Sequence, residues 1–549
     1  MPPSSSNNPD RTVVRILESD YNDLREFLLQ GDGDEYAASL YAGIHQYTDQ
    51  GEDVLEFLIT EVNLISPTEY LDQGPGVVNL GAGTLRNIAL ASTSTNRYCD
   101  PHAILIAHSH PGFERAGYSW RDDATEPGLF EPLANDGKGP HGSLQVSQEE
   151  IAGRVWPANE VTISEHGLDA CVPIDEIVII GKQSLRRDRT ANTRLPERDH
   201  TSESSHARQA LVTGTDGNAR LRDSHVAVVG AGGIGSLLIE DLANEGIGTL
   251  SIIDPDVVEK SNLSRIPYAR SQDAGPESAT PEDTDLPPAV AASSISEAGR
   301  PKVEVAADYV RGVDPDIDVR PVPYPIETER AMNATLQADV LVAATDHTTS
   351  REIISEAGQR YLRPVFDAGS NVNAEGGEVY GIETTFALTG PPWACRDCQG
   401  LVDREAVRVQ DRDPDELEYG LNLQETEQPS VLAVNRYPAA RAGYALYGYL
   451  TGLAEDEYAP TWEWDTGSTN LLDADQRSIP EEYPEERCPR CSGGLDGLRG
   501  TGDRGAFGAI SELTVSLPTE EASHPEALED DADEMSVWQA VRDVVSGFI

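Results

Sequence analysis

The chain has 549 residues, 38% of them hydrophobic, which is enough apolar material for the cores of about two to four domains. Asp and Glu number 95 against 41 Lys and Arg, and the resulting net charge of −54 is spread along the chain instead of forming one acidic tail. This balance argues against nucleic acid and anionic membranes as partners, because binding them needs a Lys/Arg surface. An acidic excess of this kind is typical of a salt-rich cytoplasm, so we expect a cytoplasmic protein from a halophilic prokaryote.

The first part of the sequence mixes strand and helix signals. Residues 1–10 are expected to be a disordered tail without the basic start and apolar stretch of a secretory signal. Residues 11–190 form the first expected domain. Within it, residues 54–65 and 103–107 predict strands, and residues 36–47 predict a helix behind an acidic turn. No apolar run approaches the roughly 18 residues needed to span a membrane.

A linker and a second domain follow. The stretch 186–205 is rich in Arg, Thr, Ser and Asp and poor in apolar residues, which places the linker at 191–205. The segment HVAVVGAGGIGSLLIEDLANEGIGTLSIID then combines a strand, a Gly-rich turn, a helix and a second strand, which is a βαβ unit. The second domain is expected over residues 206–499, with a mobile insert at 271–298 and a C-terminal extension at 500–549.

The Gly-rich turn carries the first functional signal. Glycines at a strand-to-helix turn let the backbone approach a phosphate, and the helix N-terminus offers free N–H groups; here they are Gly230, Gly232, Gly233 and Gly235. Asp254 lies 254 − 235 = 19 residues further on, where an acidic side chain accepts hydrogen bonds from a ribose. Alone, this pattern fits any dinucleotide, and a dehydrogenase is its default interpretation.

The motifs that follow change this interpretation. They are Asn262-Leu-Ser-Arg265, then Gly-Arg-Pro-Lys302, and then ADVLVAATDHTTSR, which predicts a strand ending in Asp346. With these motifs in this order, residues 206–499 resemble the ThiF/MoeB/HesA superfamily, which has the ubiquitin-activating-enzyme fold. The resemblance implies a Rossmann-like, doubly wound α/β sheet and an enzyme that uses ATP and Mg²⁺.

The resemblance also implies roles for single residues. Lys302 and Arg265 would contact the ATP phosphates, Asp254 would hold the ribose, and Asn262 would line the phosphate site. Asp346 would organise Mg²⁺ and the reacting carboxylate. Cations are needed there because attack on the α-phosphate builds negative charge. The alternatives are that Lys302 is one stray lysine of four and that Asp346 is a solvated acid at a strand end. Ile266 departs from the family, which usually has a polar residue there.

Arg208 matches a family arginine that reaches into the partner subunit's ATP site. The resemblance therefore implies a homodimer, whereas the plain alternative is a solvated linker arginine.

Two C-x-x-C pairs, Cys395/Cys398 and Cys488/Cys491, offer four thiolates for one tetrahedral structural zinc. Reduced or disulfide-bonded pairs are the alternative. The other two cysteines, Cys99 and Cys171, lie in the first domain. The second domain thus has no spare cysteine for a thioester, so it resembles superfamily members that stop at the acyl-adenylate.

The first domain contains a possible zinc site at Ala-His108-Ser-His110-Pro followed by Ser119-Trp-Arg-Asp122. Residues two apart on a strand face the same side, so both histidines can bind one ion, with Asp122 as a third ligand and water in the open position. This pattern resembles the JAB/MPN (JAMM) metalloproteases, an α+β fold. By resemblance Glu35 is the general base and Ser119 binds the tetrahedral intermediate. Because acids are abundant, Asp123 could replace Asp122 and Asp34 could replace Glu35.

Together these resemblances predict a bifunctional enzyme. The ThiF-like domain would adenylate the C-terminal carboxylate of a ubiquitin-like or sulfur-carrier protein ending in Gly-Gly, and the JAMM-like domain would hydrolyse bonds after that C-terminus. The alternatives are a sulfur-carrier adenylyltransferase of a cofactor pathway with a degenerate JAB domain, a non-enzymatic scaffold, and an oxidoreductase.

Overall fold

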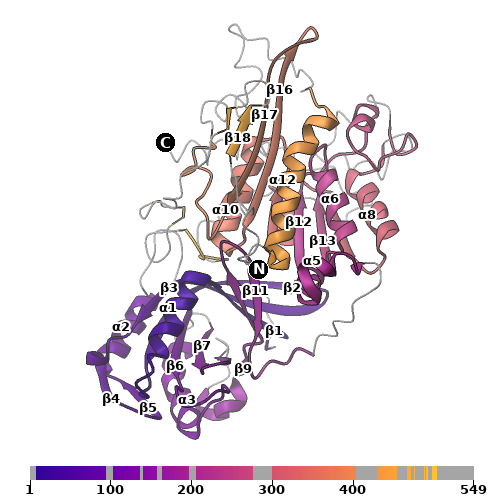
Figure 1. Ribbon diagram of the computed structural model, residues 1–549. Coiled ribbons are helices and arrows are strands. Elements are labelled where there is room, and N and C mark those ends of the chain that lie inside the picture. Colours follow the sequence, from indigo (N-terminus) through magenta and orange to yellow (C-terminus); the bar gives the residue numbers. More distant parts are fainter. Residues whose placement is uncertain are drawn as a thin grey trace, which may run out of the picture. The chain divides into compact units, whose positions relative to one another are not determined.

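The computed structural model describes residues 8–93, 103–135, 140–156, 163–196, 206–275, 299–402, 429–453, 467–470, 475–476, 488, 490–491 and 498–503. They form two compact units, the first made mainly of the described residues up to 196 and the second mainly of those from 206 onward (Figure 1). Residues 1–7 of the tail expected at 1–10, most of the insert and the extension beyond residue 503 lie outside the described residues. No described helix combines the length and the apolar character needed to cross a membrane.

The first unit is built on one mixed sheet in the order β11-β10-β1-β3-β2-β6-β7-β8-β9. The strands are β1 (Arg11–Leu17), β2 (Ala37–Asp49), β3 (Glu52–Leu64), β6 (Ala103–Ser109), β7 (His141–Val146), β8 (Ile151–Trp156), β9 (Val172–Pro173), β10 (Glu176–Ile180) and β11 (Leu185–Arg189). Its helices are α1 (Glu18–Leu28), α2 (Ala82–Thr93), α3 (Trp120–Asn135) and α4 (Ile163–His166), and a separate hairpin joins β4 (Tyr70–Gly74) to β5 (Val77–Leu80).

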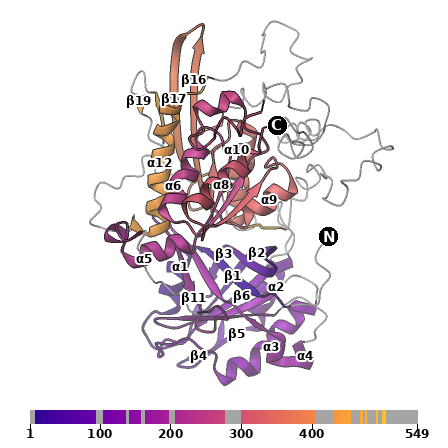
Figure 2. The ribbon, with the colours of Figure 1, turned by 90° about the vertical axis from the view of Figure 1, so that its right-hand side faces the viewer.

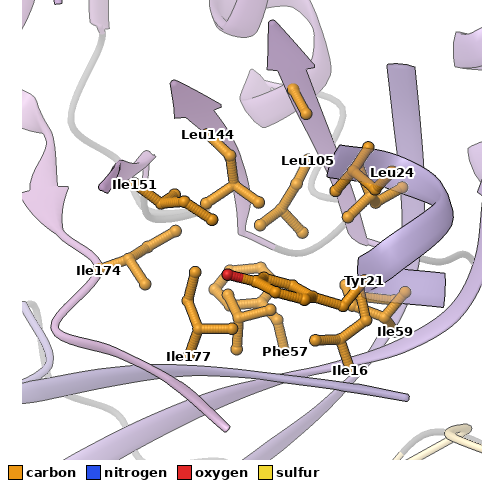
Figure 3. Close-up of a cluster of buried hydrophobic side chains, with 14 of the residues drawn as sticks. Ile16, Tyr21, Leu24, Phe57, Ile59, Leu105, Leu144, Ile151, Ile174 and Ile177 are labelled. Carbon is orange, nitrogen blue, oxygen red and sulfur yellow. The ribbon is translucent and has the colours of Figure 1, made fainter. Parts of the chain in front are cut away.

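Strand β6 shows how both faces of this sheet are buried. Leu105 points into a core that includes Tyr21 and Leu24 of α1, whereas its neighbours Ile104 and Ile106 point into a second core. Figure 3 shows Tyr21 and Leu24 lying over the strands in the first of these cores. The second core takes Ile88 from α2, Phe130 from α3 and Ile163 from α4. The period of two places His108 on the side of Ile104 and Ile106.

Two predictions of secondary structure in this unit are wrong, and two are confirmed. Residues 36–47 are predicted as a helix, but residues 37–47 belong to strand β2, because pairing with both β3 and β6 outweighs the helix preference of its Ala and Leu residues. Residues 186–189, assigned to the linker stretch, form the edge strand β11 on β10. The strands predicted at 54–65 and 103–107 are present as β3 and β6.

The second unit has an eight-stranded sheet in the order β14-β13-β12-β15-β16-β17-β18-β19. Its strands are β12 (His225–Val229), β13 (Thr249–Ile253), β14 (Asp318–Val322), β15 (Val340–Ala343), β16 (Val365–Glu375), β17 (Glu378–Thr389), β18 (Gly467–Asn470) and β19 (Asp475–Gln476). The first five are parallel. The strand order therefore reverses beside β12, and such a switch point is where open α/β sheets bind ligands at the carboxyl ends of their strands. The predicted α/β class is confirmed for this unit.

Helices connect and cover the second sheet: α5 (Ala210–Arg222), α6 (Gly235–Glu245), α8 (Lys302–Val313), α9 (Glu329–Leu336), α10 (Thr348–Tyr361) and α12 (Leu432–Thr451). Helix α12 packs on α5, α6 and β16. It runs beside the hairpin of β16 and β17, which extends beyond the parallel strands (Figures 1 and 2). The short 3-10 helix η4 (Lys260–Ser264) follows β13.

Candidate functional sites

The Gly-rich loop connects β12 to α6 and is tightly folded. Gly230 has a φ of +99°, and a Cβ there would lie 2.6 Å from the Ala344 carbonyl oxygen. A Cβ at Gly235 would lie 1.7 Å from the carbonyl oxygen of Gly230. A Cβ at Gly232, by contrast, would meet nothing within 4 Å. Gly230 and Gly235 are thus needed for the fold of the loop, while Gly232 leaves open space where a ligand can approach the backbone.

Asp254 follows β13 and holds this loop. Its carboxylate accepts hydrogen bonds from the backbone N–H groups of Ala231 (2.7 Å) and Asp256 (2.9 Å). Burial raises the pKa of Asp254, and Lys302 opposes the increase. Both carboxylate oxygens of Asp254 therefore bind backbone in this structure, and its predicted role in ribose binding stays a prediction.

Lys302 reaches Asp254 because two backbone segments pair. Val258 donates its N–H to the carbonyl of Arg300 (2.8 Å), and Lys302 donates its N–H to the carbonyl of Asp256 (2.9 Å). Lys302 is then the first residue of α8, with Nζ 2.6 Å from Asp256 Oδ2 and 3.7 Å from Asp254 Oδ1. Burial alone would lower the pKa of Lys302, but Asp254 and Asp256 outweigh it and raise the pKa. The lysine is therefore held in its charged form beside the two carboxylates, and its contact with phosphates stays a prediction.

Arg265 and Asn262 belong to the short helix η4. A Cβ on Gly233 would lie 3.4 Å from Arg265 Cδ, so this arginine passes beside the Gly-rich loop, and its contact with phosphates stays a prediction. Asn262 is buried, and its side chain caps η4 by accepting the N–H of Glu259. Capping accounts for Asn262 without a ligand. Ile266, the departure from the family pattern, is buried in the core.

Asp346 lies in the loop that follows β15, which we call the post-β15 loop (residues 344–347). The strand ends at Ala343, three residues before the predicted end. The Asp346 side chain is 88% exposed, and its charge contributes to raising the pKa of Lys302. Since Ala344 also touches Gly230, the loops that follow β12 and β15 meet at the strand-order reversal. Arg208, the residue predicted to act across a dimer, is exposed.

Two residues contribute to this region although the sequence assigns no role to either. Asn435 of α12 is buried against Gly233, and its amide accepts from the Ser370 hydroxyl (2.8 Å) and donates to that of Ser430 (3.0 Å). Arg351 of α10 donates from Nε to the Thr345 carbonyl of the post-β15 loop (2.8 Å). Arg351 stands one turn after Asp346 in the sequence, and this position could have marked it. Nothing in the local sequence marks Asn435.

The four cysteines of the two C-x-x-C pairs come together. Their four Sγ atoms all lie within 4.8 Å of one another, and three of the four residues are buried; the residues are Cys395, Cys398, Cys488 and Cys491. Four converging thiols are a donor set that zinc binds in a closed, tetrahedral structural site. The cluster is thus consistent with the predicted zinc.

A second cluster with metal-ligand chemistry lies in the first unit. The ligand atoms of His108, His110 and Asp122 lie within 4.8 Å of one another. Nε2 of His108 is 3.4 Å from Asp122 Oδ1, and Nε2 of His110 is 3.5 Å from Asp122 Oδ2. The His108 Nε2 atom is buried without a hydrogen-bond partner, which is costly unless an ion takes that place. Asp123 instead pairs with Arg154 (2.7 Å), so the geometry favours Asp122 as the ligand.

Glu35 lies beside this cluster, with Oε1 3.7 Å from His110 Nε2. The β4–β5 hairpin holds its backbone, because the Glu35 N–H donates a hydrogen bond to the Gly74 carbonyl (3.2 Å). Burial raises the pKa of Glu35. For Asp122, burial alone would raise the pKa, but the two imidazoles outweigh it and lower the pKa. One carboxyl is thereby suited to take up a proton and the other to remain ionised.

Ser119 has a clear structural role. Its hydroxyl accepts the N–H groups of Arg121 (3.2 Å) and Asp122 (3.3 Å), while Asp122 Oδ2 accepts the Ser119 N–H (2.6 Å). Ser-x-x-Asp is therefore a capping arrangement at the start of α3 that also presents Asp122 to the histidines. Its predicted contact with a reaction intermediate stays a prediction.

Several buried polar side chains close to the cluster pair with one another, and the sequence did not reveal this pairing. Glu126 accepts from Arg154 Nε (2.7 Å) and from the Ser143 hydroxyl (2.9 Å). The Arg154 guanidinium also lies 3.7 Å from the centre of the Tyr118 ring. Glu126, Ser143 and Arg154 lie on α3, β7 and β8, so only the folded unit brings them together.

Comparison with known proteins adds to this geometry. Residues 206–280 and 290–418 match the ThiF family. The SAMP-activating enzyme E1 of Haloferax volcanii is 31% identical over 185 residues, covering 33% of this chain and 56% of that protein. Human ubiquitin-like modifier-activating enzyme 7 is 32% identical over 192 residues, covering 33% of this chain and 17% of that protein.

Further similarities have a lower sequence identity. The probable adenylyltransferase/sulfurtransferase MoeZ of Mycobacterium tuberculosis is 29% identical over 144 residues, covering 26% of this chain and 31% of its own. Among solved structures, E. coli MccB with MccA is 17% identical, covering 54% of this chain and 76% of its own, with a TM-score of 0.38. The matches cover less than two thirds of each curated relative's length.

Proposed function

We propose that this chain, which contains a ThiF family domain at residues 206–280 and 290–418, uses that domain to adenylate the C-terminal carboxylate of a ubiquitin-like or sulfur-carrier protein with ATP and Mg²⁺. The observation that carries the proposal is the charged Lys302 beside Asp254 and the Gly-rich loop, at the carboxyl ends of parallel strands. The names of the relatives, an E1 for SAMP and an adenylyltransferase/sulfurtransferase, support this reaction class.

The side chains suit the charge changes of such a reaction. Attack of a carboxylate on the α-phosphate increases negative charge on that phosphate and on the departing pyrophosphate. Lys302 and Arg265 would stabilise that charge, and the open backbone at Gly232 would approach the phosphates. Asp346, exposed at the same edge of the sheet, would bind Mg²⁺ and orient the incoming carboxylate. An oxidoreductase would leave the acidic and basic groups at this edge without a role.

The activated carboxylate does not pass to a cysteine of this domain in our proposal. Beyond the four clustered cysteines, residues 206–549 contain no other cysteine. The acyl-adenylate would instead go to a sulfur donor or to an amine. The four cysteines would hold a structural zinc, and Arg208 would act in the ATP site of a second copy of the chain.

The test is pyrophosphate release by the full chain with ATP, Mg²⁺ and a candidate small protein ending in Gly-Gly. Release that requires the intact C-terminal glycine supports the proposal. A matched control is the same small protein with its C-terminal glycine removed. Mass spectrometry of the product then separates a thiocarboxylate from a protein conjugate, and absence of release with every candidate partner would count against the proposal.

We also propose a second activity, a zinc metallopeptidase in the first unit that cleaves after the same C-terminus. The convergence of His108, His110 and Asp122, with a buried Nε2 on His108 that makes no hydrogen bond, supports it. These three residues would hold the zinc, which when bound would polarise the scissile carbonyl and acidify a water. Glu35, with its raised pKa, would accept the proton and return it to the leaving amine.

Cleavage of a linear fusion, a ubiquitin-like protein followed by a short peptide, tests this activity. Cleavage after the Gly-Gly that Zn²⁺ restores to chelated enzyme supports it. A chain that keeps adenylating activity but never cleaves would instead support the alternative of a sulfur-carrier adenylyltransferase with a degenerate first domain. A non-enzymatic scaffold predicts that Lys302→Ala and His108→Ala leave cellular function intact.

A further inference from the structure

We propose that Arg396, between two clustered cysteines, positions Asp346 through a relay of two further side chains, the buried Asp367 and the partly buried Arg351. The relay runs from Arg396 to Asp367, from Asp367 to Arg351, and from Arg351 to the post-β15 loop. The importance of Asp346 rests on the proposed adenylation, whereas the existence of the relay does not. The inference concerns positioning residues, because the contacts that carry it join these three side chains to one another and to protein groups.

The first link starts in the cysteine pair. Arg396 directly follows Cys395 and precedes Cys398 by two residues, so its backbone is fixed by the same turn that sets the two thiols. The Arg396 side chain is buried and pairs with the Asp367 carboxylate. Its Nε donates to Glu352 of α10 (2.8 Å) and Nη2 donates to the Leu401 carbonyl (3.2 Å). The guanidinium is thereby held from three sides.

Asp367 is the central link. It lies on β16, is 1% exposed, and binds Arg396 through one carboxylate oxygen and Arg351 through the other. A buried carboxylate is stable as an anion only while its charge is compensated. Each arginine therefore holds the carboxylate in the orientation that the other one needs. Loss of one pair should displace the second, because the same rigid group makes both.

Arg351 carries the link to the loop. Its Nε donates to the Thr345 carbonyl (2.8 Å) and its Nη2 donates to the Ala368 carbonyl (3.0 Å). Gly369 makes room for it, since a Cβ there would lie 2.9 Å from Nη2. Thr345 is the residue before Asp346, and its backbone nitrogen lies 3.0 Å from where a Cβ on Gly230 would be. Arg351 thus holds the post-β15 loop close to the Gly-rich loop.

The Asp346 side chain itself has few anchors. It is 88% exposed and lies 3.8 Å from His347, which is also exposed, and its charge interacts with those of Lys302 and Arg351. Its position is therefore set by the backbone that Arg351 holds. Displacing a reacting group by about 1 Å from its productive geometry costs about a hundredfold in rate. The relay consequently bears on turnover more than on ATP affinity.

The test uses the full chain with Arg396→Lys, Arg396→Gln and Asp367→Asn. Hydrogen–deuterium exchange of peptides covering residues 344–348 is the readout that does not depend on activity. We expect exchange there to rise about tenfold or more while zinc content stays at the wild-type value. We expect kcat for pyrophosphate release to fall about tenfold to a hundredfold with KM for ATP nearly unchanged, and Arg396→Lys to be the mildest variant.

Asp367→Asn lies outside the cysteine pair, so it carries the test if the Arg396 variants lose zinc or fail to fold. Arg311→Gln, which removes an exposed arginine of α8 paired with Asp308, is the matched control. Unchanged exchange at 344–348 in folded, zinc-loaded variants would overturn the relay. A wild-type chain without ATP activity whose variants still loosen this loop would refute the proposed function and leave the relay intact.

Discussion

The Lys302 ammonium nitrogen lies 3.7 Å from a carboxylate oxygen of Asp254, although the two residues are 48 positions apart (302 − 254). The relationship joins the end of β13 to the start of α8 through paired backbone segments. Because Asp254 also accepts the Ala231 N–H, the same pair links the lysine to the Gly-rich loop. A basic group, a backbone turn and strand carboxyl ends are thus brought together, which is the combination that a nucleotide phosphate site requires.

Two glycines of the loop should respond differently to the same substitution. Gly232→Ala should leave Tm within about 1 °C, because its Cβ meets open space, but should weaken ATP binding about tenfold or more if phosphates approach there. Gly235→Ala should lower Tm by about 5 °C or more, because its Cβ would collide with the Gly230 carbonyl. Thermal melts and ATP titrations check both, and a Gly232→Ala protein with normal ATP affinity would contradict the phosphate assignment.

The cysteine cluster predicts one tightly bound zinc that stabilises the fold. Cys398→Ser should remove that ion and lower Tm by about 5–10 °C, because a structural zinc contributes directly to folding free energy. Elemental analysis and thermal melts measure the two effects. Cys171→Ser, outside the cluster, is the matched control and should change neither quantity. Wild-type zinc content in Cys398→Ser would show that this thiol is not a ligand.

The histidine cluster predicts a second ion with separable roles for its residues. His108→Ala should lower zinc content from two to one per chain, since it removes a ligand. Glu35→Gln should keep both ions but lower cleavage about a hundredfold or more, because an amide cannot accept the proton. Adenylation should be unaffected in both variants. Cleavage by Glu35→Gln at the wild-type rate would remove Glu35 from the proposed mechanism.

Helix α6 predicts a pH dependence of stability. Burial raises the pKa of Glu245 to about 8 from a model-compound value of 4.5, and nearby Asp241 adds to the shift. Between these values the native state keeps a proton that the unfolded chain releases, so stability falls as pH rises through this window. Glu245→Gln should therefore leave Tm almost unchanged at pH 5 and raise it by several degrees at pH 9. Asp316→Asn, at an exposed acid, is the control, and an equal effect at both pH values would contradict the prediction.

Much of the second unit could be predicted because its signals are local. The strand, the Gly-rich turn and the next strand adjoin in sequence, and the Asn-x-x-Arg motif follows directly, so short-range pattern and known loop chemistry suffice. Strand β2 could not be predicted in the same way. Its buried residues Ala38, Leu40, Ala42 and Ile44 alternate as a strand requires, but Ala and Leu are also good helix formers, and pairing with β3 and β6 decides between the two.

Several contacts around the sites join residues that are distant in sequence. Asp367 lies 16 residues from Arg351 and 29 from Arg396, and Glu126 lies 28 from Arg154. In an acidic chain, no single Asp or Glu stands out. Only the order of the strands identifies the few that pair with a buried arginine.

The central claim is that the edge of the sheet at Lys302 binds ATP. Calorimetric titration of the full chain with ATP and Mg²⁺, beside Lys302→Met and with NAD as the competing ligand, tests it most directly. Our account predicts saturable ATP binding, a loss of about a hundredfold or more in affinity in Lys302→Met, and no competition by NAD. ATP affinity equal in both proteins, or binding of NAD in place of ATP, would contradict it.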